Sequence, residues 1–180
     1  AKFVPHSCLA CHGGTYDPST ARVEGATLPP LDPGQLVFPT QARPAAQEES
    51  LRTINNMVLR SNPAPVVAEY VRGLYRGTPD VVGTVAKDDF VPAGWEQAPQ
   101  LYQRVVKPYC ATCHMALTSR NDFGTYQNFF GLKERVKQLV CQTRSMPHAE
   151  AAFNAFWTDG GTGSLPAYLM NALGLGSCAP

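Results

Sequence analysis

Two copies of one short cysteine–histidine pattern constrain this chain more than any other feature of its sequence. In each copy two residues separate a pair of cysteines, and a histidine follows the second cysteine directly. The copies are CLACH at residues 8–12 and CATCH at residues 110–114. They begin 102 residues apart, which indicates two separate sites.

This pattern is typical of covalent haem attachment. Each thiol can form a thioether with one haem vinyl group, and the two-residue spacing lets both sulfurs reach neighbouring edges of one macrocycle. The histidine that follows then lies beneath the iron as its proximal ligand. We therefore expect two haem c groups, the first held by Cys8 and Cys11 with His12 on its iron, and the second held by Cys110 and Cys113 with His114 on its iron.

Three other kinds of site use paired cysteines. Two such pairs could form a four-cysteine zinc site, but that interpretation leaves both trailing histidines unexplained. A thioredoxin-like dithiol should follow a strand in a βαβ unit, and the sequence shows no such alternation. A simple disulfide within each pair also gives the histidines no role.

The composition excludes two broad classes of function. The 180-residue chain has a formal net charge of +1, with 16% charged residues, so it lacks the basic surface of a nucleic-acid-binding protein. It is 44% apolar, enough for a core, but no run approaches the roughly 18 apolar residues of a membrane span. Its 15 glycines and 16 prolines predict extensive loops.

Haem attachment also predicts where the protein works. Bacterial c-type haems are attached by exported machinery, so we expect a periplasmic or extracellular protein. No export signal is visible before Cys8, so one was either cleaved or left off. In an oxidising compartment the two remaining cysteines, Cys141 and Cys178, predict a disulfide, with two free buried thiols as the alternative.

The fold class is predicted as all-α with long loops. No strand or hairpin signal stands out, and residues 13–46 are expected to form a long loop. Leu51, Ile54 and Val58 form the apolar stripe of the first expected helix. Apolar residues at helical spacing predict helices over 45–60, 64–76, 101–109, 131–140, 153–157 and 165–173. We expect two cytochrome c-like lobes, each around one covalent haem, over residues 1–79 and 97–180, with a linker at 80–96.

Residues 97–176 resemble a class I cytochrome c domain. The shared order is a helix, the C-x-x-C-H motif, further helices, the pair Met146-Pro147 and a closing helix. The resemblance implies that Met146 is the distal ligand of the haem on His114, with His148 as the rival ligand. The whole chain is similar to the tandem di-haem cytochromes c. Its first lobe departs from them, because it has no helix before Cys8 and no Met-Pro pair.

The distal ligand of the first haem has three alternatives. Met57 lies 49 residues beyond Cys8, in the right part of its lobe, although it also fits the core of a helix. His6 is too close to Cys8 to reach over its own haem, but it could bind a neighbouring haem. The third alternative is an open site. Arginines are candidates for pairing with the haem propionates, namely Arg60, Arg72, Arg76, Arg120 and Arg144.

These features predict an electron-transfer protein rather than an enzyme. A di-haem cytochrome c would pass single electrons between redox proteins, either alone or beside neighbouring cytochrome subunits in a larger redox assembly. The alternative is a peroxidase-like or thiosulfate-oxidising di-haem enzyme with an open first haem.

Overall fold

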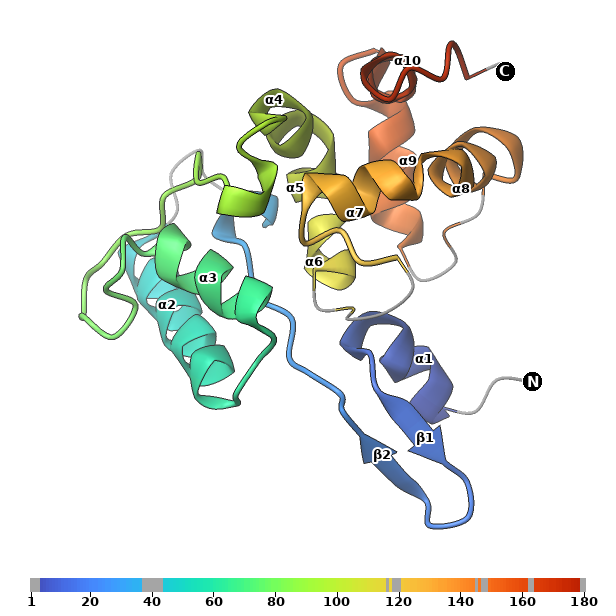
Figure 1. Ribbon diagram of the computed structural model, residues 1–180. Helices are drawn as coiled ribbons and strands as arrows, with labels where there is room; N and C mark the ends of the chain where they lie inside the picture. The colour runs from blue at the N-terminus through green and yellow to red at the C-terminus, as the bar shows by residue number, and fades with distance from the viewer. Residues whose placement is uncertain are drawn as a thin grey trace.

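Helices make up most of the structure, which confirms the all-α class. The computed structural model describes residues 4–36, 44–115, 117, 121–144, 146, 149–161 and 164–178 (Figure 1). Among the described helices, none is both long and apolar enough to cross a lipid bilayer, as the composition predicts.

The N-terminal segment differs from the prediction in two ways: a helix begins before Cys8, where none was expected, and a small hairpin forms within the predicted long loop. Helix α1 (Val4–His12) contains the whole first motif and begins four residues before it. Strands β1 (Thr15–Asp17) and β2 (Arg22–Glu24) then pair antiparallel. The turn between them is held by the Asp17 carboxylate, which accepts hydrogen bonds from Ser19 and Thr20. The prediction that no strand forms was wrong here, because such short strands carry no alternating pattern.

Two helices predicted from apolar spacing form an antiparallel pair, α2 (Ala45–Arg60) and α3 (Pro65–Leu74). The turn between them contains Asn62 with a positive φ of 55°, a conformation that asparagine tolerates well. The stripe expected on α2 was partly wrong, because Ile54 is 41% exposed. Helix α3 buries a continuous apolar face made of Val67, Tyr70, Val71 and Leu74.

The helix that leads into the second motif is continuous, but its middle segment is π-helical. It begins as α4 (Pro99–Leu101), widens to a π-helical turn η3 (Tyr102–Val106) and returns to α-helix in α5 (Lys107–Tyr109). Pro108 has no N–H to continue the usual hydrogen-bond ladder at this point. The short helix α6 (Ala111–His114) follows and contains most of the motif.

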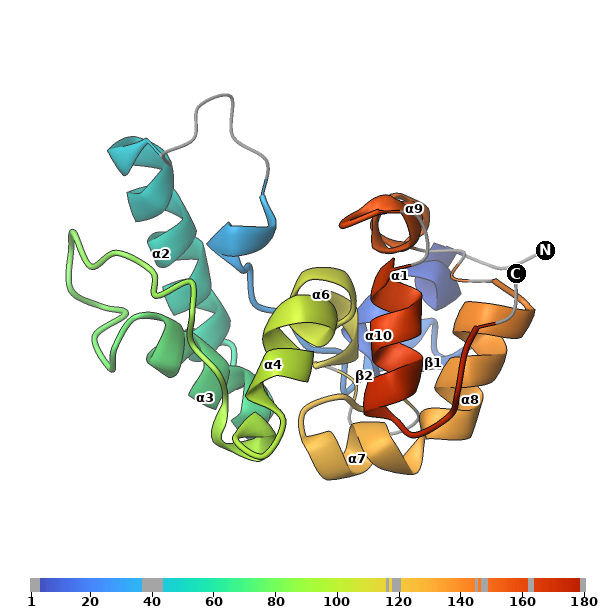
Figure 2. The ribbon, with the colours of Figure 1, turned by 90° about the horizontal axis from the view of Figure 1, so that it is seen from above.

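Helices after the second motif enclose its cavity. They are α7 (Tyr126–Gly131), α8 (Lys133–Lys137) with its π-helical extension η4 (Gln138–Gln142), α9 (Glu150–Thr158) and α10 (Ser164–Ala172). The three helices that the sequence predicts in this part are therefore confirmed. Figure 2 shows α10 lying between α7, α8 and α9, while α2 and α3 lie at the opposite end of the molecule.

The segment over residues 80–96 is largely exposed in its first half, but its end is anchored. It ends in the 3₁₀ turn η2 (Ala93–Trp95), and Trp95 is completely buried. The Trp95 ring contacts the rings of Tyr102 and Phe129, and its indole N–H donates to the Phe123 carbonyl at 3.0 Å. Trp95 thus anchors this segment to the helices around the second motif.

Cys141 and Cys178 are paired, as the sequence predicts. Their Cα atoms lie 5.2 Å apart and the structure joins their sulfurs in a disulfide. Cys141 is buried in η4, so the bond attaches the segment after α10 to the helix that lines the cavity.

Candidate haem sites

The second motif is positioned by the end of one helix and the start of another. Cys110 precedes the first residue of α6, and the His114 N–H donates to the Cys110 carbonyl at 3.1 Å. Residues four apart on a helix lie on the same face. Cys110 and His114 therefore face the same space, and Cys110 and Cys113 together line an adjoining groove.

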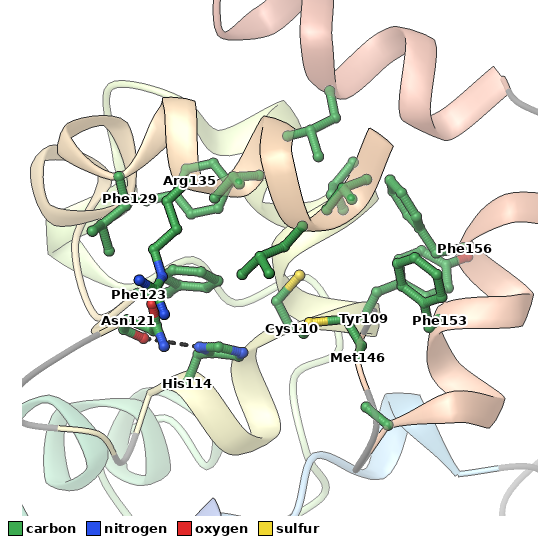
Figure 3. A pocket seen from close by; sticks show the side chains of 17 residues that line it. Tyr109, Cys110, His114, Asn121, Phe123, Phe129, Arg135, Met146, Phe153 and Phe156 are labelled. Carbon is green, nitrogen blue, oxygen red and sulfur yellow. Dashed lines mark hydrogen bonds between the residues drawn. The ribbon is translucent and has the colours of Figure 1, made fainter. Parts of the chain in front are cut away.

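That space is an apolar cavity that opens to solvent, and its empty volume is about 650 Å³ when the open solvent at its mouth is included. Figure 3 shows Cys110, His114 and Met146 around it, with aromatic side chains from α7 and α9. The full lining is Val105, Tyr109, Cys110, His114, Asn121, Phe123, Phe129, Leu132, Arg135, Val136, Leu139, Val140, Met146, Ala149, Phe153, Phe156 and Leu169. One charged side chain among largely apolar ones suits a flat apolar ring with carboxylates at one edge.

The structure brings Met146 to the same cavity as His114. Met146 is half-buried and comes from the segment before α9, 32 residues beyond His114. A thioether at this position is a soft donor that stabilises ferrous iron. Pro147 and the rival ligand His148 lie outside the described residues.

The His114 ring is held in one orientation and one tautomer. Its Nδ1 lies 2.9 Å from the Asn121 carbonyl, which can only accept, so Nδ1 carries the proton. The Phe123 ring stacks on the imidazole, with centroids 4.2 Å apart and planes 9° from parallel. Burial lowers the pKa of His114 and so favours the neutral ring. Nε2 is left with a free lone pair, as a metal ligand requires.

Arg135 is a site residue that the sequence analysis missed. It projects from α8, and its exposed side chain reaches the rim of the cavity (Figure 3). Its signal was present, because Arg135 occupies the i+3 position of the apolar stripe that starts at Leu132. The predicted arginines lie elsewhere: Arg144 stacks on Trp157 at 4.3 Å, Arg60, Arg72 and Arg76 do not line this cavity, and Arg120 is outside the described residues.

The first motif repeats the histidine arrangement of the second. His12 Nδ1 lies 2.8 Å from the Thr27 carbonyl, and the Thr27 N–H donates to the His12 carbonyl, also at 2.8 Å. The segment after β2 therefore fixes the imidazole and leaves Nε2 free. Cys8 is exposed and Cys11 half-buried, so this site is more open than the second.

Of the two candidate ligands for the distal side of the first site, only Met57 has a described side chain. Met57 is on the outer face of α2, and its side chain is 62% exposed, so it is not part of the hydrophobic core. His6 is part of α1, and its side chain is outside the described part of the structure.

The two motifs lie against each other, although they begin 102 residues apart in the sequence. Helix α1 packs on α6 (Figure 1), and the Cys11 and Cys113 thiols are in hydrogen-bond contact. Burial raises the pKa of both Cys110 and Cys113 to about 12, and for Cys113 the contact with Cys11 adds to this rise. Within the described ranges, no three His, Cys, Asp or Glu side chains cluster to hold a metal ion.

A buried polar network supports the second motif from behind. The Gln35 side chain accepts a hydrogen bond from the Thr112 hydroxyl and donates to the Lys107 carbonyl. The Lys107 ammonium donates to the Asp88 carbonyl and lies 3.7 Å from the Asp32 carboxylate. The network thus joins three segments that are distant in the sequence, at residues 32–35, 88 and 107–112. Thr112, which lies between the two cysteines of the motif, is its contact with the motif.

Comparison with protein-family models, curated proteins and solved structures finds no match to this chain. The resemblance to class I cytochromes c therefore depends on the motifs and on the order of the helices around them.

Proposed function

We propose that this chain is a di-haem c-type cytochrome that transfers single electrons between redox proteins. The observation that carries the proposal is shared by both motifs. In each motif the histidine Nδ1–H donates a hydrogen bond to a backbone carbonyl. The Nε2 atom is then left without a proton, and the two cysteines of the motif are free thiols. A four-cysteine zinc site or a disulfide within each pair would not need either imidazole to be oriented in this way.

Each residue has a defined part in this proposal. Cys8 and Cys11 would hold one haem and Cys110 and Cys113 the other, with His12 and His114 as proximal ligands. A bound haem supplies an iron that gains or loses one electron. The protein around the second site fixes His114 through Asn121, excludes water with its apolar lining and offers Met146 as sixth ligand. The Arg135 guanidinium would balance the carboxylates at the cavity rim.

A carrier needs irons whose two axial positions are both filled by the protein, because a filled position leaves no place for a substrate. Met146 supports this for the second site. Its partners would be redox proteins or neighbouring cytochrome subunits, met through brief contacts. The covalent chemistry of haem c supports an exported, periplasmic or extracellular location.

The openness of the first site supports a second candidate function. Cys8 is exposed and Met57 lies at the surface, so an iron on His12 could keep one position for a substrate. That arrangement would suit a peroxidase-like or thiosulfate-oxidising enzyme, in which the second haem relays electrons.

Haem analysis and spectroscopy of the exported protein test the proposal. We expect two haems per chain, attached to peptides that contain residues 8–12 and 110–114, and low-spin spectra for both. Absence of covalent haem from both peptides contradicts the proposal. A five-coordinate, high-spin signal with peroxide or thiosulfate turnover would favour the enzyme over the carrier.

A further inference from the structure

The contact between the two motifs joins equivalent positions. Cys11 is the second cysteine of the first motif and Cys113 the second cysteine of the other, and each directly precedes its histidine. Their thiols touch where α1 packs against α6. Figure 1 shows these two helices as neighbours. The two sulfurs in contact are therefore both atoms that would attach a haem.

Space beside this contact is also available. A groove lined by both Cys110 and Cys113 opens beside the second motif, and its empty volume is about 690 Å³ when open solvent is included. Thr112, Gln35, Pro108 and Tyr109 also border it, and the opposite wall is Ala149 and the first residues of α9, which include Glu150. The neighbourhood of Cys113 is therefore not filled by packed side chains.

From these two observations we propose that the chain builds one coupled redox pair rather than two independent haem sites, with Cys11 and Cys113 as the point of contact. This inference rests on the proposed function, since both motifs must hold haem. With both haems bound, the pair would hold up to two electrons, one on each iron. Electron exchange between them would oxidise one iron and reduce the other, with no bond formed or broken.

Coupling has a spectroscopic signature that independent haems lack. Two strongly absorbing rings held close together give a bisignate circular dichroism signal in the Soret region, whereas distant rings give the sum of two separate signals. The signal depends on the mutual placement of the rings and not on any partner or activity.

Two single-cysteine variants of the di-haem protein separate the contact from attachment in general. C11A removes the sulfur that touches Cys113 and leaves Cys8 to hold the haem. C8A is the matched control, because it also leaves one thioether but retains the contact. We expect C11A to lose most of the bisignate signal and C8A to keep most of it. Equal losses in both variants, or a larger loss in C8A, would overturn the proposal.

The double variants C8S/C11S and C110S/C113S provide the reference spectra of single haems. A di-haem spectrum that exceeds their sum supports the coupled pair, and a spectrum equal to their sum overturns it. Haem content, measured on every sample, separates the two levels of inference. Two attached haems without coupling refute this proposal alone, whereas no attached haem refutes the proposed function. If a double variant fails to fold, the comparison of C11A with C8A still decides.

Discussion

The Asp32 carboxylate and the Lys107 ammonium face each other 3.7 Å apart in the interior, and each side chain is 6% exposed or less. They come from the loop after the hairpin and from the helix that enters the second motif. Opposite charges buried this deeply attract strongly, but each loses its hydration. The position of the loop therefore depends on that of the helix, because neither charge can be buried favourably without the other.

Removing one partner of this pair should destabilise the protein strongly. For D32N we expect a loss of about 3–5 kcal/mol in the free energy of unfolding, because the Lys107 charge stays buried without its carboxylate. The double variant D32N/K107M should lose less than the sum of D32N and K107M. Urea unfolding of the haem-loaded protein measures all four. Strictly additive losses would show that the two groups do not interact.

Replacement of Met146 should change the second haem site without unfolding it. M146A removes the soft sixth ligand, so we expect a lower reduction potential and loss of the weak charge-transfer band of methionine-bound ferric iron. M170L is the control, because Met170 is a fully buried core methionine that does not line the cavity. If M170L and M146A change the spectrum alike, Met146 is not the ligand.

Arg135 should raise the reduction potential of the second site. Removal of a positive charge near the iron favours the ferric state, so R135L should lower the potential, and R135K should lower it less because it keeps the charge. The R60L variant has the same change of net charge on the exposed end of α2, and it should leave the potential unchanged. Redox titration of each variant measures the potential. An equal shift of the potential in R60L would show that Arg135 has no local effect on the second site.

Cys110 should react slowly with alkylating reagents in the folded, haem-free chain. Its pKa of about 12 leaves roughly one thiol in 10⁴ or fewer ionised near neutral pH. We expect Cys110 to be labelled far more slowly than exposed Cys8, and its labelling rate to rise about tenfold per pH unit. In urea, which unfolds the chain, the two cysteines should be labelled at the same rate. Labelling of Cys110 as fast as Cys8 would contradict this.

The same pKa gives a pH dependence of stability. An unfolded thiol ionises near pH 8.5, so holding Cys110 neutral stabilises the folded chain below about that pH. This contribution falls as the pH rises toward 12.

The Cys141–Cys178 disulfide should contribute substantially to stability. It closes a segment with a sequence separation of 37 residues, for which the chain-entropy relation gives about 4 kcal/mol. The C141S/C178S variant should therefore unfold at lower urea concentration, and a reductant should then have no further effect on it. An unchanged midpoint would show that the bond does not constrain the unfolded chain.

The sequence predicted best where the signal is local. The apolar spacing of α2, α3 and α10 and the fixed spacing within each motif are properties of neighbouring residues. Helix α1 was missed because its apolar residues do not gather on one side. Arg135 was missed because a charge within an apolar stripe is usually a surface residue.

Long-range relations were beyond the sequence. Nothing near Cys11 indicates that it touches Cys113, because that contact comes from the packing of two helices that are distant in the chain. The same holds for Asp32 and Lys107, which read separately as ordinary surface charges.

The π-helical turn over Tyr102–Val106 determines which way the residues that follow it in the helix face. A π-helical turn holds one residue more than an α-helical turn, and one residue corresponds to about 100° of rotation. A regular α-helix with the same number of residues would rotate Cys110 and His114 by about 100°, away from Met146, whereas deleting one residue there would restore regular pitch and keep their orientation. The π-helical turn thus accommodates one extra residue before the motif without changing the direction in which the motif faces.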